Sequence, residues 1–271
     1  MDMSRIVDCH THSCRSFDAV PSVMWLAKKA SEQGLGGIAV TDHCEINVEG
    51  KQKLWSYRKL AKSAREAVKA KEKGLSMLCG VELGQPTYHP ESAKRVLEGA
   101  EYDIVLGSIH YLRDGRDFYY LRYTDGSCDP AEVYDRYLDE VLRMAEESDF
   151  DSLAHLTYPL RYIYGRDGVR LDMARYEDKY EQILTVLVQR GKALEINTSG
   201  ARRENGFMLP DTRLVRRFRE LGGKYITLGS DTHKPAQFAA GLEQGARQAL
   251  AAGFTEAVYF KERRPVSYRL G

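Results

Sequence analysis

The chain has 271 residues, of which 43% are hydrophobic and 29% charged, an ordinary globular composition with enough apolar side chains for a sizeable core. Its formal net charge of +1 argues against long nucleic acids and anionic membrane surfaces as partners. The five cysteines form no CxxC pair, which excludes a dense disulfide framework and predicts a reduced, cytoplasmic protein.

Short apolar segments rich in β-branched residues alternate with amphipathic segments along the chain. The predicted strands cover residues 5–9, 37–40, 76–81, 103–109, 152–154, 193–197 and 224–228. Helices are predicted between the strands. Three of them begin at Pro21, Pro90 and Pro235, and four others cover about 52–73, 129–147, 172–190 and 210–223. Two polar, tyrosine-rich stretches, 111–128 and 156–168, are predicted as loops, and 258–260 as an edge strand.

This alternation predicts an α/β fold with a parallel sheet and helical connections. A distorted (βα)7 barrel of the TIM type fits better than an open sheet, because polar candidate residues follow all seven strands. The strand ends of a barrel share one mouth, whereas an open sheet gathers its ligands at a single switch point. The phosphate-binding patterns GxGxxG and GxxxxGK[ST] are missing, and no linker or repeat divides residues 1–271, which are expected to form one domain.

Six of the seven histidines fall at predicted strand ends, and only His89 lies elsewhere. His10 and His12 have the i, i+2 spacing that points two side chains to the same side of a strand. Glu82 and Asp231 end other strands and add oxygen ligands. Any one of these histidines could be structural, but together they predict a site for Zn, Mn or Fe. Eight or nine ligands are too many for one tetrahedral ion, so a cluster of two to three ions is expected.

The residues at these strand ends resemble the motifs of the PHP (polymerase and histidinol phosphatase) superfamily, and within it those of the histidinol-phosphatase type. The motifs run along nearly the whole chain: Asp8-Cys9-His10-Thr11-His12, Thr41-Asp42-His43, Gly80-Val81-Glu82, Gly107-Ser108-Ile109-His110, His155, Glu195-Ile196-Asn197-Thr198-Ser199-Gly200 and Gly229-Ser230-Asp231-Thr232-His233. The resemblance implies a distorted (βα)7 barrel with a trinuclear site at its mouth, which agrees with the strand count.

The resemblance also implies how the ligands divide among three ions. The first ion is expected on His10, His12, Glu82 and Asp231. Glu82 would bridge to a second ion held with His110 and His155, and a third would lie on Asp18, His43 and His233. Asp18 is the position at which some relatives carry a histidine. Asp42 either orients a ligand imidazole or caps a turn, and it is one candidate, beside a metal-bound water, for protonating the leaving group.

The predicted activity is hydrolysis of a phosphomonoester, because a metal-bound water can ionise near pH 7 and attack phosphorus in line. Arg161 is the first candidate for a phosphate clamp and Arg15 a weaker one, although arginines are common on surfaces. Asp42, Arg161 and His233 are the predicted catalytic residues. The family resemblance favours L-histidinol phosphate, a substrate of histidine biosynthesis. Asn197 and Tyr158 are candidate substrate contacts, and ordinary loop packing is the alternative for the loop tyrosines.

Two other functions remain open from the sequence. One is a phosphodiesterase or exonuclease that acts on small nucleotide substrates, since some relatives are associated with polymerases. The other is a metal-binding module without activity. No segment is long and apolar enough to span a bilayer, and the early first strand leaves no room for a signal peptide. The sequence does not fix the metal, the ester or the oligomeric state.

Overall fold

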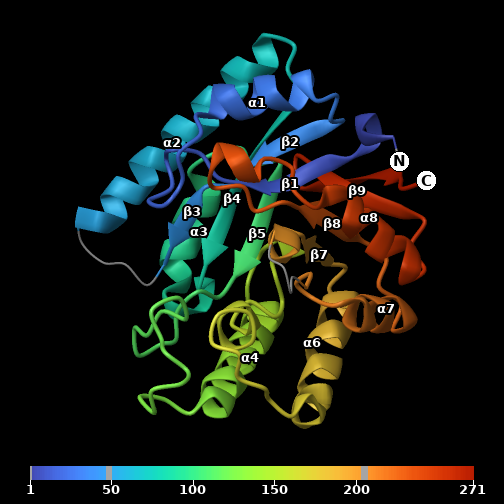
Figure 1. The fold of residues 1–271 in the computed structure, drawn as a ribbon. Coiled ribbons are helices and arrows are strands. Elements are labelled where there is room, and N and C mark those ends of the chain that lie inside the picture. Colours follow the sequence, from blue (N-terminus) through green and yellow to red (C-terminus); the bar gives the residue numbers. More distant parts are fainter. Residues whose placement is uncertain (1, 47–50, 203–206) are drawn as a thin grey trace.

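The computed structural model describes residues 2–46, 51–202 and 207–271. Seven parallel strands follow one another around the molecule, as the sequence predicts (Figure 1). In spatial order they are β1 (Val7–Thr11), β2 (Gly37–Val40), β4 (Met77–Gly84), β5 (Ile104–Ser108), β6 (Ser152–Leu153), β7 (Ala193–Asn197) and β8 (Ile226–Gly229).

The sheet nearly closes on itself because the segment after β8 returns to β1. The backbone N–H of His12 donates to the carbonyl of Thr232 at 2.9 Å, and that of Asp231 donates to the carbonyl of His10 at 2.8 Å. Two segments from opposite ends of the chain therefore join at the C-terminal ends of the strands. This seam places candidate ligands from both segments next to each other.

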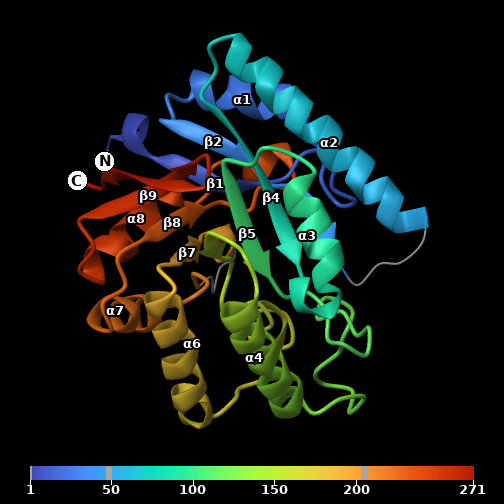
Figure 2. The ribbon, with the colours of Figure 1, turned by 180° about the vertical axis from the view of Figure 1, so that it is seen from behind.

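Helices surround the strands on the outside (Figures 1 and 2). They are α1 (Val23–Glu32), α2 (Lys51–Glu72), α3 (Pro90–Glu98), α4 (Pro130–Glu147), α6 (Glu177–Gln189), α7 (Thr212–Glu220) and α8 (Leu242–Ala251). The predicted start of α4 is confirmed: the carboxylate of Asp129 accepts a hydrogen bond from the N–H of Ala131, and Pro130 occupies the first helical position. At α1 the cap is Ser22, which accepts from the N–H of Trp25, so Pro21 lies before the helix and not in it.

The end of the chain forms a hairpin and not the single edge strand that the sequence predicts. β9 (Glu256–Lys261) pairs with β10 (Arg264–Arg269) in antiparallel register. Val258 and Phe260 belong to a second, smaller buried cluster that also contains residues of the barrel strands. The N–H of Arg263 donates to the carbonyl of Asp103, just before β5, so the hairpin tip lies at the end of the barrel opposite the mouth.

Other details of the secondary structure also differ from the sequence prediction. A short strand, β3 (His43–Glu45), pairs with β4 in parallel register, and β4 extends past Glu82 to Gly84. The short helix α5 (Leu160–Ile163) lies within a segment predicted as a loop. 3-10 turns at Met173–Tyr176 and Pro235–Gln237 occupy the predicted starts of α6 and α8. Within the described ranges, none of the helices has both the length and the apolar character that crossing a membrane requires.

Candidate metal centre

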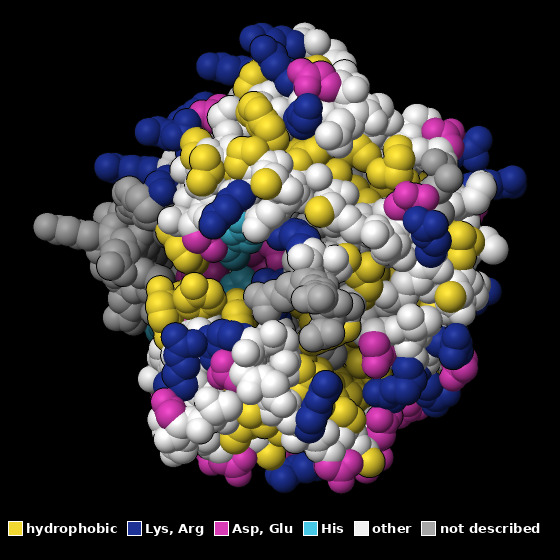
Figure 3. Space-filling model, in the orientation of Figure 1, with side chains coloured by type: hydrophobic (Ala, Val, Ile, Leu, Met, Phe, Trp, Pro, Cys, Tyr) yellow, Lys and Arg dark blue, Asp and Glu magenta, His cyan; other side chains and the backbone are white. Residues whose placement is uncertain are grey.

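All nine predicted metal ligands come together at the C-terminal mouth of the barrel. β1, β3 and β4 carry His10, His43 and Glu82, and the other six side chains lie in the segments that follow strands. Figure 3 shows histidine and acidic side chains at the bottom of a hollow. Most of the ligands are buried, whereas the Asp18 side chain is 41% exposed. The seventh histidine, His89, is exposed at the start of α3, away from this group, as predicted.

The first predicted group has the spacing of ligands around one ion. Nε2 of His10 and Nε2 of His12 are 3.0 Å apart, and the Asp231 carboxylate lies 3.8 and 3.5 Å from them. The Glu82 carboxylate completes the group at 3.4 and 3.5 Å from the same two nitrogens. Two ligand atoms on a tetrahedral zinc ion are about 3.3 Å apart, given bonds of about 2.0–2.1 Å. His10, His12 and Asp231 therefore suit a common ion, and Glu82 lies beside both imidazoles of that group.

The first group lies against Oε2 of Glu82, and the second predicted group lies against Oε1 of the same side chain. Oε1 of Glu82 lies 2.8 Å from Nε2 of His155 and 3.2 Å from Nε2 of His110, and these two nitrogens are 3.4 Å apart. The first group meets Oε2 of the same carboxylate, so one side chain presents an oxygen to each of two groups. This is the geometry that a bridging carboxylate requires.

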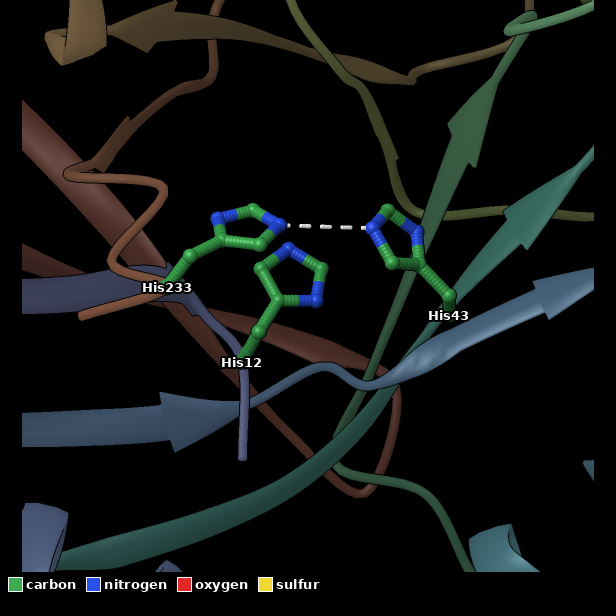
Figure 4. Close-up of side chains that lie close together, drawn as sticks. All are labelled: His12, His43 and His233. Carbon is green, nitrogen blue, oxygen red and sulfur yellow. Dashed lines mark hydrogen bonds between the residues drawn. The ribbon is translucent and has the colours of Figure 1, made fainter. Parts of the chain in front are cut away.

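The third group lies nearest the opening. Nε2 of His43 and Nε2 of His233 are 3.4 Å apart, and the two carboxylate oxygens of Asp18 lie 3.6 and 3.2 Å from them. In Figure 4 the rings of His12, His43 and His233 face one another, and the dashed line joins the last two. The His12 ring stacks at 4.2 Å from His43 and 4.1 Å from His233. His12 therefore lies between the first and the third group.

The carboxylates and imidazoles of the site shift one another's pKa values. Burial lowers the pKa of an imidazole, yet the carboxylates around His10 and His110 outweigh burial and raise both pKa values, that of His110 to about 10. Burial acts to raise the pKa of Glu82, but the surrounding imidazoles lower it well below its usual range. For His12 and His155 burial dominates and lowers the pKa. The carboxylates thus require positive charge, which protons or metal ions can supply.

An unsatisfied buried oxygen indicates that a cation fits here. Oε2 of Glu82 is buried and makes no hydrogen bond to any described residue, although Nδ1 of His43 lies 2.8 Å away. A buried carboxylate oxygen without a hydrogen bond is costly, so such atoms usually mark an ion or a functional site. Two candidate ligands, His155 (φ 28°) and Asp231 (φ 55°), also have left-handed backbone conformations, which are uncommon outside glycine and concentrate at functional sites.

Two buried glutamates behind the histidines were not assigned roles from the sequence. Glu195 lies 2.7 Å from Nδ1 of His10, and Glu45 lies 2.9 Å from Nδ1 of His110. A carboxylate on the far nitrogen of a ligand imidazole orients the ring and leaves the near nitrogen for the metal. The i, i+2 spacing of His43 and Glu45 on one strand is the sequence signal that could have revealed the second of them.

Two glycines leave room for these glutamates. A Cβ atom on Gly229 would lie 2.1 Å from Oε1 of Glu195 and 2.6 Å from Cβ of His10. A Cβ atom on Gly84 would lie 2.2 Å from the Glu45 carboxylate. Real side chains do not tolerate such approaches, so both positions need glycine to keep the orienting carboxylates in place.

Asp42 is linked to the candidate ligand His12 through the hydroxyl of Ser16. Its carboxylate accepts hydrogen bonds from the N–H and hydroxyl of Ser13 and from the hydroxyls of Ser16 and Ser63, at 2.6–2.8 Å. The Ser16 hydroxyl lies 3.2 Å from Nδ1 of His12. This arrangement supports the orienting role for Asp42, because its oxygens are already occupied by four donors.

The predicted substrate residues lie beside the ligands. Arg161 donates to Oδ2 of Asp231 at 2.9 Å and to the Ser199 hydroxyl, and it lies on helix α5 and not in a loop. The ring of Tyr158 packs 5.0 Å from His110. Asn197 is buried, donates to Glu195 at 3.2 Å and accepts from Ser199. Its amide thus supports the carboxylate behind His10, and its contact with substrate stays a prediction.

The weaker phosphate candidate, Arg15, points elsewhere. Its guanidinium pairs with Glu66 of α2. The described geometry therefore favours Arg161 over Arg15 as the residue that meets an anion at the centre.

Known proteins resemble this chain along most of its length. A model of the PHP domain family matches residues 8–199. The "Probable histidinol-phosphatase" of Clostridium acetobutylicum is 30% identical over 234 residues, which are 84% of this chain and 86% of that protein. The "Probable histidinol-phosphatase" of Thermotoga maritima is 28% identical over 243 residues, 90% of this chain and 91% of that protein.

A solved structure shares the fold. The histidinol phosphate phosphatase of Lactococcus lactis, in complex with zinc, L-histidinol and phosphate, superposes with a TM-score of 0.76 at 25% sequence identity. The match covers 97% of this chain and 99% of that one. The near-closed parallel barrel is therefore an established architecture for a zinc-containing enzyme.

Proposed function

The chain belongs to the PHP domain family, and we propose that it is a metal-dependent phosphomonoesterase that hydrolyses L-histidinol phosphate to L-histidinol and inorganic phosphate. The observation that carries the proposal is the group of nine ligands at one mouth, with distances that suit three neighbouring ions. The Lactococcus lactis enzyme, which resembles this chain along almost its whole length, contains zinc together with both products of that reaction.

The side chains of the centre have separate tasks in this proposal. His10, His12, Glu82 and Asp231 would hold one ion, and Glu82 would share its other oxygen with the ion on His110 and His155. Asp18, His43 and His233 would hold the third. Ions in these positions supply the positive charge and the activated water that phosphate ester hydrolysis needs.

Arg161 would bind the phosphate group. Its guanidinium is fixed between Asp231 and Ser199, and the ring of Tyr158 lies 5.1 Å beneath it. A guanidinium can donate two parallel hydrogen bonds to a phosphate and add charge against the developing transition state. Because Asp231 is itself a ligand, the arginine is held at the edge of the metal group, where an ester on the ions would meet it.

The test is a comparison of three substrates on metal-loaded protein: L-histidinol phosphate, glycerol phosphate and the diester bis(p-nitrophenyl) phosphate. We expect a clear preference in kcat/KM for L-histidinol phosphate. Equal efficiency on the two monoesters would leave a phosphatase of broad specificity. Faster turnover of the diester would contradict the proposal and favour the phosphodiesterase alternative.

A further inference from the structure

The candidate ligand His155 lacks a support that two neighbouring imidazoles have on the far side of the ring. Behind His10 that support is Glu195, 2.7 Å from Nδ1. Behind His110 it is Glu45, 2.9 Å from Nδ1. Nδ1 of His155 is buried and makes no hydrogen bond to any residue that the structure describes. The direction of this ring therefore depends on how its backbone is held.

The backbone at His155 has a conformation that other contacts must maintain. Its φ of 28° lies in the left-handed region, which is costly for a residue with a Cβ atom and persists only where the surroundings fix it. On the amide side, the N–H of His155 donates to Oε2 of Glu195 at 2.7 Å. A second restraint is needed on the carbonyl side, where the chain continues into the buried Leu156.

Tyr137 of α4 supplies that second restraint. Its phenol donates to the carbonyl of Leu156 at 2.7 Å and lies 3.4 Å from the carbonyl of His155. Burial raises the pKa of Tyr137 above its usual range, so the hydroxyl keeps its proton and acts as a donor. The side chain is only 1% exposed, and bulk water therefore does not compete for these carbonyls.

The ring of Tyr137 is itself held in place by aromatic packing. Phe118 meets it edge-on with ring centroids 5.4 Å apart, and Tyr134, one turn earlier on α4, stacks on it at 5.8 Å. Phe118 also donates its backbone N–H to the carbonyl of His110 at 3.3 Å. One buried aromatic cluster thus supports the backbones of His110 and His155, the two imidazoles of the second predicted group.

We propose that Tyr137 is a positioning residue of the metal centre. Its hydrogen bond to the Leu156 carbonyl keeps the backbone of His155 left-handed. That conformation points Nε2 of His155 at Oε1 of Glu82, 2.8 Å away, the oxygen that faces the second predicted group. Tyr137 acts through the backbone of a ligand and not on the reacting atoms. The inference rests on the metal centre of the proposed function, but not on which ester is hydrolysed.

The variant Tyr137→Phe tests the inference, because it removes one oxygen atom and keeps the ring. We expect one of the bound ions to be held roughly ten- to a hundredfold less tightly than in the wild-type protein, since one ligand is no longer fixed in direction. The other ions should keep their affinity. The measurement is a competition titration of zinc into the apo protein against a chelator of known affinity, resolved ion by ion. Equal weakening of every ion, or of none, would overturn the inference.

Tyr134→Phe is the matched control. Tyr134 is as buried as Tyr137 and lies on the same helix, but its hydroxyl bonds Tyr180 instead of the segment that carries a ligand. Each variant loses one buried hydrogen bond, so calorimetry of the two apo proteins should show similar decreases in Tm. Only Tyr137→Phe should change metal affinity. The same weakening of one ion in both variants would mean a general loss of rigidity and would overturn the positioning role.

Two further readouts do not depend on the stability of the fold. The visible absorption of cobalt(II), bound in place of zinc, depends on the directions of its ligands, so we expect the spectrum to change in Tyr137→Phe and to stay the same in Tyr134→Phe. Tyr137→4-aminophenylalanine places an N–H donor where the hydroxyl was, and it should restore wild-type affinity. Affinity that stays low in this variant at a wild-type Tm would contradict the role of the donor.

These measurements use no substrate and so separate the inference from the proposed function. A wild-type protein that binds no more than one ion would overturn the metal centre itself, and the inference with it. Two or three ions held equally tightly by the wild-type protein and by Tyr137→Phe would overturn the positioning role alone.

Discussion

The carboxylate of Glu195 lies 2.7 Å from Nδ1 of His10, and neither residue is exposed to solvent. The second oxygen of Glu195 accepts from the backbone N–H of His155 at 2.7 Å. One side chain from β7 thus fixes a candidate ligand on β1 and the backbone of a second candidate ligand after β6. With its Nδ1 bound to the carboxylate, His10 presents Nε2 to the metal group.

Our first prediction concerns Glu195→Gln. The amide keeps the size of the side chain but removes the charge that orients His10, so we expect metal affinity to fall about ten- to a hundredfold. The measurement is a competition titration of the apo protein against a chelator of known affinity. Glu181→Gln, an exposed glutamate paired with Arg217 on the outer helices, is the control. Unchanged affinity in Glu195→Gln would rule out the orienting role.

The second prediction concerns the carboxylate that faces two groups. Because Glu82 presents Oε1 to His155 and Oε2 to His12, we expect Glu82→Gln to lose two ions together. Elemental analysis of the purified variant gives the ratio of metal to protein. Loss of a single ion would limit Glu82 to one group, and full metal content would exclude bridging.

The third prediction separates substrate binding from metal binding. We expect Arg161→Ala to raise KM for a phosphomonoester roughly ten- to a hundredfold, because a charge-assisted hydrogen bond is worth about 1.5–3 kcal/mol. Metal content should stay at the wild-type value. Arg15→Ala, whose guanidinium pairs with Glu66, is the control and should keep wild-type kinetics. Wild-type KM in Arg161→Ala would remove this arginine from the site.

The fourth prediction is that metal stabilises the fold. The centre buries carboxylates and imidazoles whose charges an ion would neutralise. An ion present at a hundred times its dissociation constant adds about 2.7 kcal/mol to the free energy of unfolding, which corresponds to roughly 5–10 °C in Tm. Calorimetry of the protein with and without a chelator measures the shift. An equal Tm in both samples would contradict the fit of metal to these residues.

Much of this architecture could be predicted from the sequence because of one physical regularity. A parallel barrel turns each apolar run into a buried strand and brings the end of every run to one mouth. The polar residues that follow the runs, such as His110 and His155, therefore had to converge. The same reasoning located Arg161 near the centre, since its segment follows β6.

The features that were missed lack such a pattern. β3 has three residues and a single apolar one, Cys44, so it gives no apolar run, and Glu45 went unnoticed with it. Glu195 lies within a buried strand, and the sequence alone does not show whether a carboxylate at such a position orients a ligand or has no role in the site. The serines that surround Asp42 come from segments far apart in the chain, which only the fold brings together.

The central claim is that a metal group made by these ligands hydrolyses a phosphomonoester. The most direct measurement is phosphate release from L-histidinol phosphate by the apo protein as zinc is added in known equivalents. We predict that activity is absent without metal and rises until two to three equivalents are bound. Activity that survives complete metal removal, or that reaches its maximum at one equivalent, would contradict the account.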